Sequence, residues 1–349
     1  DLSDTGTLVM AGGAIEGGTV TRPSDSSAKL QFQKDQGSNA LRGVTVEVPL
    51  DLTAERSRVN ITDGLTLNAT ATLGNRARID SEATQTIGGQ GELVFAPDNN
   101  WQEARLRLRD RTVLTLGPNL TVDGHSAEIE RINHDDPVAL VNQGTLASDA
   151  TGRAVQVHGG VDLVNQGTLQ ASGGGYLDID ELEGELGDVT LNQDSRLDVN
   201  GAFTNTRSRN VPQAGRLIFD GSWRNEAPIT ATGGRVDLRG DWTNAADVVV
   251  NDGRLDLHGD WSNPATLETS ASEVELGGRF TLGDLGSFTR NGGTVRLVGT
   301  LDNAGTTLDL SDTGTLVMAG GAIEGGTVTR PSDSSAKLQF QKDQGSNAL

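Results

Sequence analysis

The chain has 349 residues, of which 46 are glycine and only 3% are aromatic; it lacks cysteine and carries a formal net charge of −20 at pH 7. So few aromatic side chains argue against an ordinary globular core, and the high glycine content is typical of many short strands joined by tight turns. The negative charge repels phosphate backbones and anionic lipid headgroups, so we expect neither nucleic-acid binding nor membrane insertion of this segment.

The first half of the chain shows a strand pattern whose spacing drifts. Apolar and polar residues alternate over residues 44–52, which is the two-residue period of a half-buried strand. The phrase LVNQGTL begins at Leu140 and again 23 residues later at Leu163. The two most polar stretches, residues 97–112 and 205–214, are expected to bulge outward as loops.

The second half of the chain repeats a strand at a regular interval. Seven aligned segments begin at Ser195, Gly215, Gly234, Gly253, Ser272, Gly293 and Gly314, with spacings of 20, 19, 19, 19, 21 and 21 residues. Each segment alternates apolar with polar residues and is followed by a glycine, which adopts the positive φ of a corner at no steric cost. We therefore predict an all-β fold, a parallel β-helix (β-solenoid) with about 19–23 residues per coil.

Two columns of residues follow the corner glycines. The first column contains Phe203, Trp223, Trp242, Trp261 and Phe280, and the second contains Asn205, Asn225, Asn244, Asn263 and Asn303. The aromatic column keeps the inward phase of the strand, so we expect a buried stack; a platform for stacking sugars is the alternative. The asparagines can bond amide to amide along the axis, as in other stacked β structures.

The sequence also contains a much longer repeat, which spans many coils. Residues 1–41 recur without a single change as residues 309–349, an offset of 308 residues. We interpret residues 1–308 as one full repeat unit, 309–349 as the start of the next copy, and 1–349 as one continuous solenoid. About 15 coils per unit would advance the axis by roughly 70 Å, since neighbouring strands lie about 4.8 Å apart. Adjacent repeats would then be partners end to end, and lateral self-association is a second option.

Polar residues supply few candidates for a chemical site. The acidic residues Asp178, Asp180, Glu181 and Glu183 could bind Ca²⁺ through their carboxylates. Their spacing matches neither an EF-hand nor the glycine-rich nonapeptide repeat, and a solvated acidic face is the favoured interpretation. The histidines His125, His134, His158 and His258 are scattered and share no local motif. We therefore expect no catalytic residue, no other metal site and no cofactor.

A charged pattern follows the regular strands. The column Arg196, Arg216, Arg235 and Arg254 is accompanied two places later by Asp198, Asp237 and Asp256. We expect these residues to form salt bridges across an exposed face, each contributing little to stability.

The phrases LVNQGTL, WTNAADVVVNDGRLDLHGDW and GTLDNAGTTLDL resemble the coils of large bacterial exoproteins of the filamentous-haemagglutinin and giant repetitive adhesin type. The resemblance implies a right-handed parallel β-helix, export through a Gram-negative outer membrane, and an extracellular or cell-surface location. It transfers no functional residue to this chain.

Together, the repeats and the resemblance predict an internal segment of a structural rod, stalk or fibre, not an enzyme. The alternative is a repeat region that itself binds glycans or neighbouring cells. A polysaccharide-degrading β-helix enzyme is a third reading. Identical tandem copies and scattered histidines disfavour it.

Overall fold

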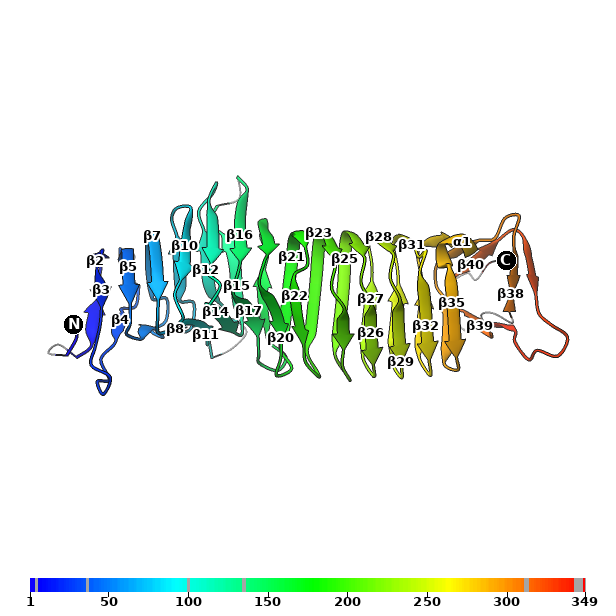
Figure 1. Ribbon diagram of the computed structural model, residues 1–349, viewed down its shortest axis with the longest axis horizontal. Coiled ribbons are helices and arrows are strands. Elements are labelled where there is room, and N and C mark those ends of the chain that lie inside the picture. Colours follow the sequence, from blue (N-terminus) through cyan, green and yellow to red (C-terminus); the bar gives the residue numbers. More distant parts are fainter. Residues whose placement is uncertain are drawn as a thin grey trace. The chain divides into compact units, whose positions relative to one another are not determined.

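The computed structural model describes residues 1–3, 6–35, 38–98, 101–133, 136–310, 314–341 and 348, so His134 lies outside the described residues. The chain divides into two compact units, Asp1–Thr190 and Leu191–Leu349. Each unit is a β-solenoid of stacked parallel coils, and the described residues make about 15 turns of roughly 21 residues (Figure 1). The predicted fold is thereby confirmed; the continuity of the two units stays a prediction.

Unit 1 is built from short strands joined by tight corners. In chain order the strands are β1 (Leu8–Met10), β2 (Ala14–Glu16), β3 (Thr19–Val20), β4 (Leu30–Phe32), β5 (Ala40–Val46), β6 (Leu50–Leu52), β7 (Arg58–Leu67), β8 (Thr70–Leu73), β9 (Arg78–Ser81), β10 (Gln85–Gly88), β11 (Glu92–Phe95), β12 (Ala104–Leu108), β13 (Val113–Leu116), β14 (Thr121–Gly124), β15 (Ala127–Arg131), β16 (Val138–Asn142), β17 (Thr145–Ser148), β18 (Ala154–Val157), β19 (Val161–Asn165), β20 (Thr168–Ala171), β21 (Tyr176–Glu185) and β22 (Asp188–Leu191).

Three columns of parallel strands form the faces of unit 1. The first is the sheet β1-β4-β6-β8-β11-β14-β17-β20-β22. The second runs β2-β5-β7-β9-β12-β15-β18-β21, and the third runs β3-β5-β7-β10-β13-β16-β19-β21. The long strands β5, β7 and β21 bend around a corner and therefore belong to two faces.

Unit 2 repeats this plan with more regular coils. Its elements are β23 (Arg196–Asn205), β24 (Arg209–Val211), β25 (Arg216–Asn225), β26 (Ile229–Thr232), β27 (Arg235–Leu238), β28 (Asp241–Asn244), β29 (Val248–Asn251), β30 (Arg254–Leu257), β31 (Asp260–Ser262), β32 (Thr266–Ser270), β33 (Glu273–Leu276), β34 (Arg279–Thr281), α1 (Leu282–Leu285), β35 (Ser287–Asn291), β36 (Thr294–Leu297), β37 (Thr300–Asp302), β38 (Thr307–Asp309), β39 (Leu316–Met318), β40 (Ala322–Glu324), β41 (Thr327–Thr329) and β42 (Leu338–Phe340).

The faces of unit 2 are again columns of parallel strands. They include β23-β25-β27-β30-β33-β36-β39-β42 and β24-β26-β29-β32-β35. The one-turn helix α1 follows β34, and a capping box between Thr281 and Asp284 begins it. Among the described residues, no helix is long and apolar enough to cross a membrane.

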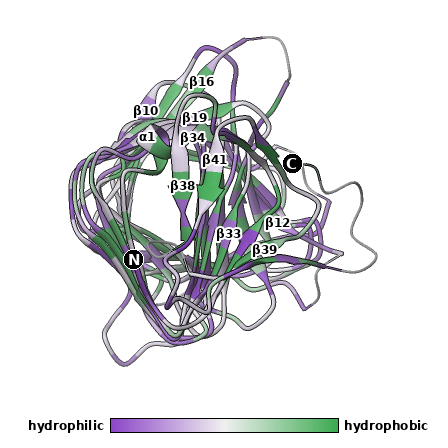
Figure 2. Ribbon diagram, turned by 90° about the vertical axis from the view of Figure 1, so that its right-hand side faces the viewer, coloured by the Kyte–Doolittle hydropathy of each residue, from purple (hydrophilic) through white to green (hydrophobic). Residues whose placement is uncertain are grey.

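The core is made by the inward residues of each strand. Leu197 lies opposite Leu217, and Val199 lies opposite Phe219, with all four side chains buried. Green and purple segments alternate along the strands in Figure 2, as expected when one side of each strand faces the core. Burying a large aliphatic or aromatic side chain contributes roughly 1.5–3 kcal/mol, and in a solenoid these contributions add coil by coil.

The corner glycines are required by close backbone approach as well as by positive φ. A Cβ placed on Gly240 would lie 2.0 Å from the carbonyl oxygen of Gly221, and one on Gly259 would lie 1.9 Å from that of Gly240. Both residues have positive φ, 84° and 91°. Any side chain here would push adjacent coils apart.

The prediction that residues 97–112 and 205–214 bulge as loops is wrong in part, because strands β12 and β24 lie within them. In β12, Leu106 and Leu108 are buried while Arg105 and Arg107 are only half-buried. The strand alternation is present in the sequence, but the many charged residues around it hide it.

Candidate functional site

One outer face of unit 1 carries two adjacent columns of charged side chains. The register places Arg78, Arg105, Glu128 and Gln156 opposite one another in four successive coils, with Asp80, Arg107 and Glu130 in the neighbouring column. Side chains at these positions meet because paired strands lie about 4.8 Å apart. The face therefore changes from basic to acidic between β12 and β15.

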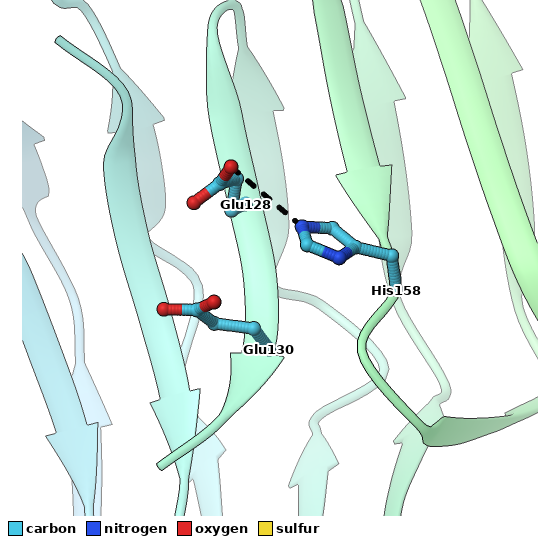
Figure 3. Close-up of side chains that lie close together, drawn as sticks. All are labelled: Glu128, Glu130 and His158. Carbon is cyan, nitrogen blue, oxygen red and sulfur yellow. Dashed lines mark ion pairs between the residues drawn. The ribbon is translucent and has the colours of Figure 1, made fainter. Parts of the chain in front are cut away.

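Glu128, Glu130 and His158 come together where this face turns acidic. One ligand atom from each residue lies within 4.8 Å of the others. The Nε2 atom of His158 is 3.7 Å from Oε1 of Glu128, and Figure 3 shows the imidazole directed at this carboxylate with Glu130 beside it. All three side chains are half-buried, so each interaction is partly shielded from water.

Arg105, on the neighbouring strand β12, forms ion pairs with both carboxylates. Its Nε donates to Oε2 of Glu128 at 2.6 Å and lies 3.4 Å from Oε1 of Glu130. The interaction with the Glu128 carboxylate raises the pKa of His158. The pKa of Glu128 falls to about 2, chiefly because of its interaction with His158 and then because it accepts a hydrogen bond from Arg105.

An imidazole and two carboxylates are a donor set that Zn²⁺ and similar divalent cations accept. However, the guanidinium of Arg105 forms ion pairs with both carboxylates, and these ion pairs would have to break before a cation could bind. The arrangement therefore acts first as an ion-pair network that ties three coils together.

A second group of the same composition lies on unit 2. It consists of Asp256, His258 and Glu275, and His258 Nε2 is 3.4 Å from Oε1 of Glu275. Arg254 again donates to both carboxylates, at 2.8 Å to Asp256 and 2.9 Å to Glu275. Here burial lowers the pKa of the histidine, outweighing the opposing effect of Glu275.

The expected salt bridges of unit 2 are present, but two of their three aspartates are buried. Asp237 and Asp256 are completely inaccessible to solvent, and the partly exposed guanidinium groups of the neighbouring arginines cover them. Arg235 bridges the two, at 2.8 Å to Asp237 and 2.7 Å to Asp256. The prediction of an exposed face is therefore wrong for these two carboxylates, whereas the small contribution of each pair to stability stays a prediction.

The four carboxylates proposed for Ca²⁺ all lie on β21 but on two faces. Asp178 accepts from Gln156 at 3.1 Å on the face shared with β18. Glu181 and Glu183 flank Leu182, which pairs with β19 on the next face. Within the part of the chain that the structure describes, these four residues form no group of three converging ligand atoms. The corner in β21 separates Asp178 and Asp180 from the two glutamates.

The aromatic column lies inside the solenoid. Its ring centroids are 5.9, 5.2, 5.5 and 4.9 Å apart in the order Phe203, Trp223, Trp242, Trp261 and Phe280. Each side chain is at most 4% exposed. The indole nitrogens donate to the carbonyls of Arg239, His258 and Gly277 at 2.8–3.0 Å. Rings buried on both faces present no surface for a sugar.

The asparagine column forms a continuous chain of hydrogen bonds over four coils. Asn205, Asn225 and Asn244 each donate to the amide oxygen of the next asparagine, at 2.6, 2.7 and 2.6 Å, ending at Asn263. Arg209 donates to Asn205 at one end, and Asn263 donates to the carbonyl of Leu285 at the other. Asn303 stands apart and donates to Thr327, because helix α1 interrupts the column.

The groups centred on His158 and His258 were not anticipated from the sequence. Strand pairing aligns four residues that are 27, 23 and 28 positions apart in the sequence: Arg78, Arg105, Glu128 and Gln156. Such uneven spacing hides the column. The available signal was the repeated alternation of ARLRL, AEIER and AVQV, once aligned by their buried residues.

No family model, curated protein or solved structure matches the chain. The resemblance to repetitive exoproteins thus stays an expectation. Function has to be inferred from the residues and coils of this chain.

Proposed function

We propose that this chain is a segment of a long structural filament or stalk at a bacterial cell surface, built from tandem copies of a 308-residue unit. The observation that carries the proposal is the exact recurrence of residues 1–41 as residues 309–349. In a solenoid, each coil contacts only its neighbours, so duplicating a unit adds length without requiring a new fold.

The two copies of this segment fold with the same register. In unit 1, Leu8 pairs with Leu30 and Ala14 with Ala40. In unit 2, the residues 308 positions later repeat both pairings, Leu316 with Leu338 and Ala322 with Ala348. The segment therefore forms the same coil in two different surroundings, which is what a repeating unit requires.

The exposed fractions of two equivalent leucines support direct joining of one 308-residue copy to the next. Leu316 is 2% exposed because β39 pairs with β36 of the preceding coil. Leu8, its equivalent in β1, is 36% exposed, and β1 is the first strand that the structure describes. A preceding copy that placed its last coil against β1 would cover this leucine in the same way.

A structural role also fits the composition. Without cysteine, stability has to come from stacked coils, and the surplus negative charge keeps such an assembly soluble. Secretion and the cell-surface location rest on the sequence resemblance. A polysaccharide-degrading enzyme is the rival class, and release of reducing ends from acidic polysaccharides by the purified chain would favour it.

Negative-stain electron microscopy of chains with one, two and four copies of the 308-residue unit tests the proposal. We expect the length to grow by roughly 70 Å per copy at constant width, because about 15 coils stack at about 4.8 Å each. A control with a flexible Gly-Ser linker between copies should show separate segments. Compact beads in the unmodified chains would overturn the filament role.

A further inference from the structure

A cavity of about 350 Å³ opens on unit 1, on the basic side of the charged face. Five arginines and a tryptophan line it: Arg56, Arg58, Arg76, Arg78, Arg105 and Trp101. Two carboxylates, Asp35 and Glu103, complete the wall. The volume falls within the range of small-molecule sites, and cations outnumber carboxylates in a chain whose net charge is −20.

The coils themselves stack these arginines. Arg58, Arg78 and Arg105 lie opposite one another in three successive coils. Arg56 and Arg76 lie two residues before the first two of these, at corners where φ is 59° and 55°. Like charges placed directly opposite one another destabilise a sheet. Carboxylates of the chain or of a bound ligand therefore have to compensate the charge of such a column.

Unit 2 shows how the fold compensates an arginine column internally. There, Arg235 and Arg254 are each followed two places later by a buried aspartate that they bond, Asp237 and Asp256. In unit 1, the residues two places after Arg58, Arg78 and Arg105 are Asn60, Asp80 and Arg107. Only Asp80 is acidic, and it is shared between Arg78 at 3.1 Å and Arg107 at 2.8 Å.

Arg58 is the least compensated member of the column. Its Nε is buried and has no hydrogen-bond partner among the described residues. The corner arginines Arg56 and Arg76 approach Glu55 only to 3.8 and 3.7 Å. Burial lowers the pKa of Arg78; the charge of Asp80 opposes this shift, and the charges of Arg107 and Arg58 add to it. Arg78 and Arg105 already bond Asp80 and Glu128. The donors offered to an external anion are therefore those of Arg56, Arg58 and Arg76.

Trp101 adds an apolar ring to this charged wall. It is 85% exposed, whereas the other three tryptophans of the chain are at most 4% exposed. An exposed indole beside guanidinium groups can stack on a ligand ring while the guanidinium groups bind its charge. The cavity thus combines a site for an anionic group with a site for a ring.

We propose that this cavity binds an acidic sugar residue, whose carboxylate is held by the arginines and whose ring packs on Trp101. Arginine binds carboxylates through two parallel hydrogen bonds, which gives direction as well as charge. Asp35 and Glu103 are placed to accept hydrogen bonds from sugar hydroxyls. This binding site goes beyond the filament role and does not depend on it.

Isothermal titration calorimetry of the 349-residue chain with tetragalacturonate, and with neutral cellotetraose as the matched ligand, tests the proposal. We expect heat of binding with tetragalacturonate alone. The variants Arg58→Gln and Trp101→Ala should each weaken binding at least tenfold. Arg224→Gln removes the same charge from an exposed ion pair with Glu226 on unit 2 and should leave binding unchanged.

Thermal melting distinguishes this role from a structural one. Because Arg58→Gln relieves like-charge repulsion, it should leave the melting temperature unchanged or raise it while weakening binding. Arg58→Lys keeps the charge but not the paired donors, and should also bind more weakly. The proposal is overturned if both tetrasaccharides bind alike, if neither binds, or if Trp101→Ala has no effect. It is also overturned if inorganic sulfate or an oligothymidylate competes as well as tetragalacturonate does.

Discussion

Phe32 and Phe340 occupy the same position in two identical copies of one sequence, yet Phe32 is fully buried and Phe340 is 52% exposed. The difference follows from the next coil. Strand β4, which contains Phe32, pairs with β6, whereas β42, which contains Phe340, pairs on one side only, with β39, among the described strands. The burial of this side chain therefore reports whether a further coil has been added.

This difference predicts unequal effects of the same substitution. Phe32→Ala should lower the free energy of unfolding by about 3–5 kcal/mol, as for other buried phenylalanines, and Phe340→Ala by less than about 1 kcal/mol. When the chain is extended by the next copy, Phe340→Ala should become as costly as Phe32→Ala. Urea denaturation followed by circular dichroism measures both. An extended chain that still tolerates Phe340→Ala would contradict the direct joining of copies.

The asparagine column predicts a large effect from a small change. Asn244 is fully buried, accepts from Asn225 and donates to Asn263. Asn244→Ala leaves a donor on one neighbour and an acceptor on the other unsatisfied, at about 1–3 kcal/mol each. We expect a total loss of about 2–6 kcal/mol in urea denaturation.

The neighbouring residue provides the control for this substitution. Thr243→Ala alters the same strand at a half-buried outward position and should change stability by less than about 0.5 kcal/mol. Equal losses for Asn244→Ala and Thr243→Ala would show that the column does not act as a hydrogen-bonded ladder.

The regular coils of unit 2 were predictable because their columns repeat at nearly constant spacing. Trp223, Trp242 and Trp261 align in the register that the sequence implied. The same rule placed Asn303 in the column, but α1 replaces the asparagine position between it and Asn263, so the hydrogen-bonded ladder does not reach Asn303. A capping box at Thr281 begins the helix there. The repeat spacing of the strands does not reveal such a local interruption.

Features of unit 1 escaped prediction for a different reason. Arg58, Arg78 and Arg105 are in register although 20 and 27 residues separate them. Trp101 lies in a stretch expected to be an isolated loop. Because coil length varies here, only strand pairing brings these residues together. The burial of Asp237 was also missed, because alternation separates inward from outward residues but does not show which outward residues are covered by neighbouring arginines.

The ion pair between Glu128 and His158 predicts a stability that depends on pH. The folded pKa of His158 is raised and that of Glu128 is lowered to about 2. The pair is therefore fully stabilising between the unfolded pKa values of about 4.5 and 6.5. Its contribution is lost as pH rises through the folded pKa of His158, and again as pH falls toward 2.

NMR titration of the imidazole protons checks this directly. His158 should titrate above the ordinary histidine value and His258 below it, since burial lowers the pKa of His258. Glu128→Gln should bring the pKa of His158 down without moving that of His258, and should flatten the change in melting temperature between pH 6 and pH 8.5. If His158 titrates below His258, the ion pair is absent in solution.

Asp123 predicts a stabilising substitution. Its Oδ1 is buried and lacks a hydrogen-bond partner among the described residues. Burial, then the charges of Glu92 and Asp149, raises its pKa to about 7. Between the unfolded pKa of about 3.9 and 7, the native state holds a proton that the unfolded state has released, so the free energy of unfolding falls as pH rises through this window.

Asp123→Asn removes this penalty and should therefore stabilise the chain at pH 8, by about 1–2 kcal/mol after allowance for solvent screening, while changing little at pH 4. Asp63→Asn is the matched control, because it removes a carboxylate from an exposed corner of the same unit with no comparable burial. Urea denaturation at the two pH values measures both variants. The expected gain depends on ionisation of Asp123, so an equal gain in stability at pH 4 and pH 8 would show that packing causes it. A loss of stability at pH 8 would show that the carboxylate has a stabilising partner.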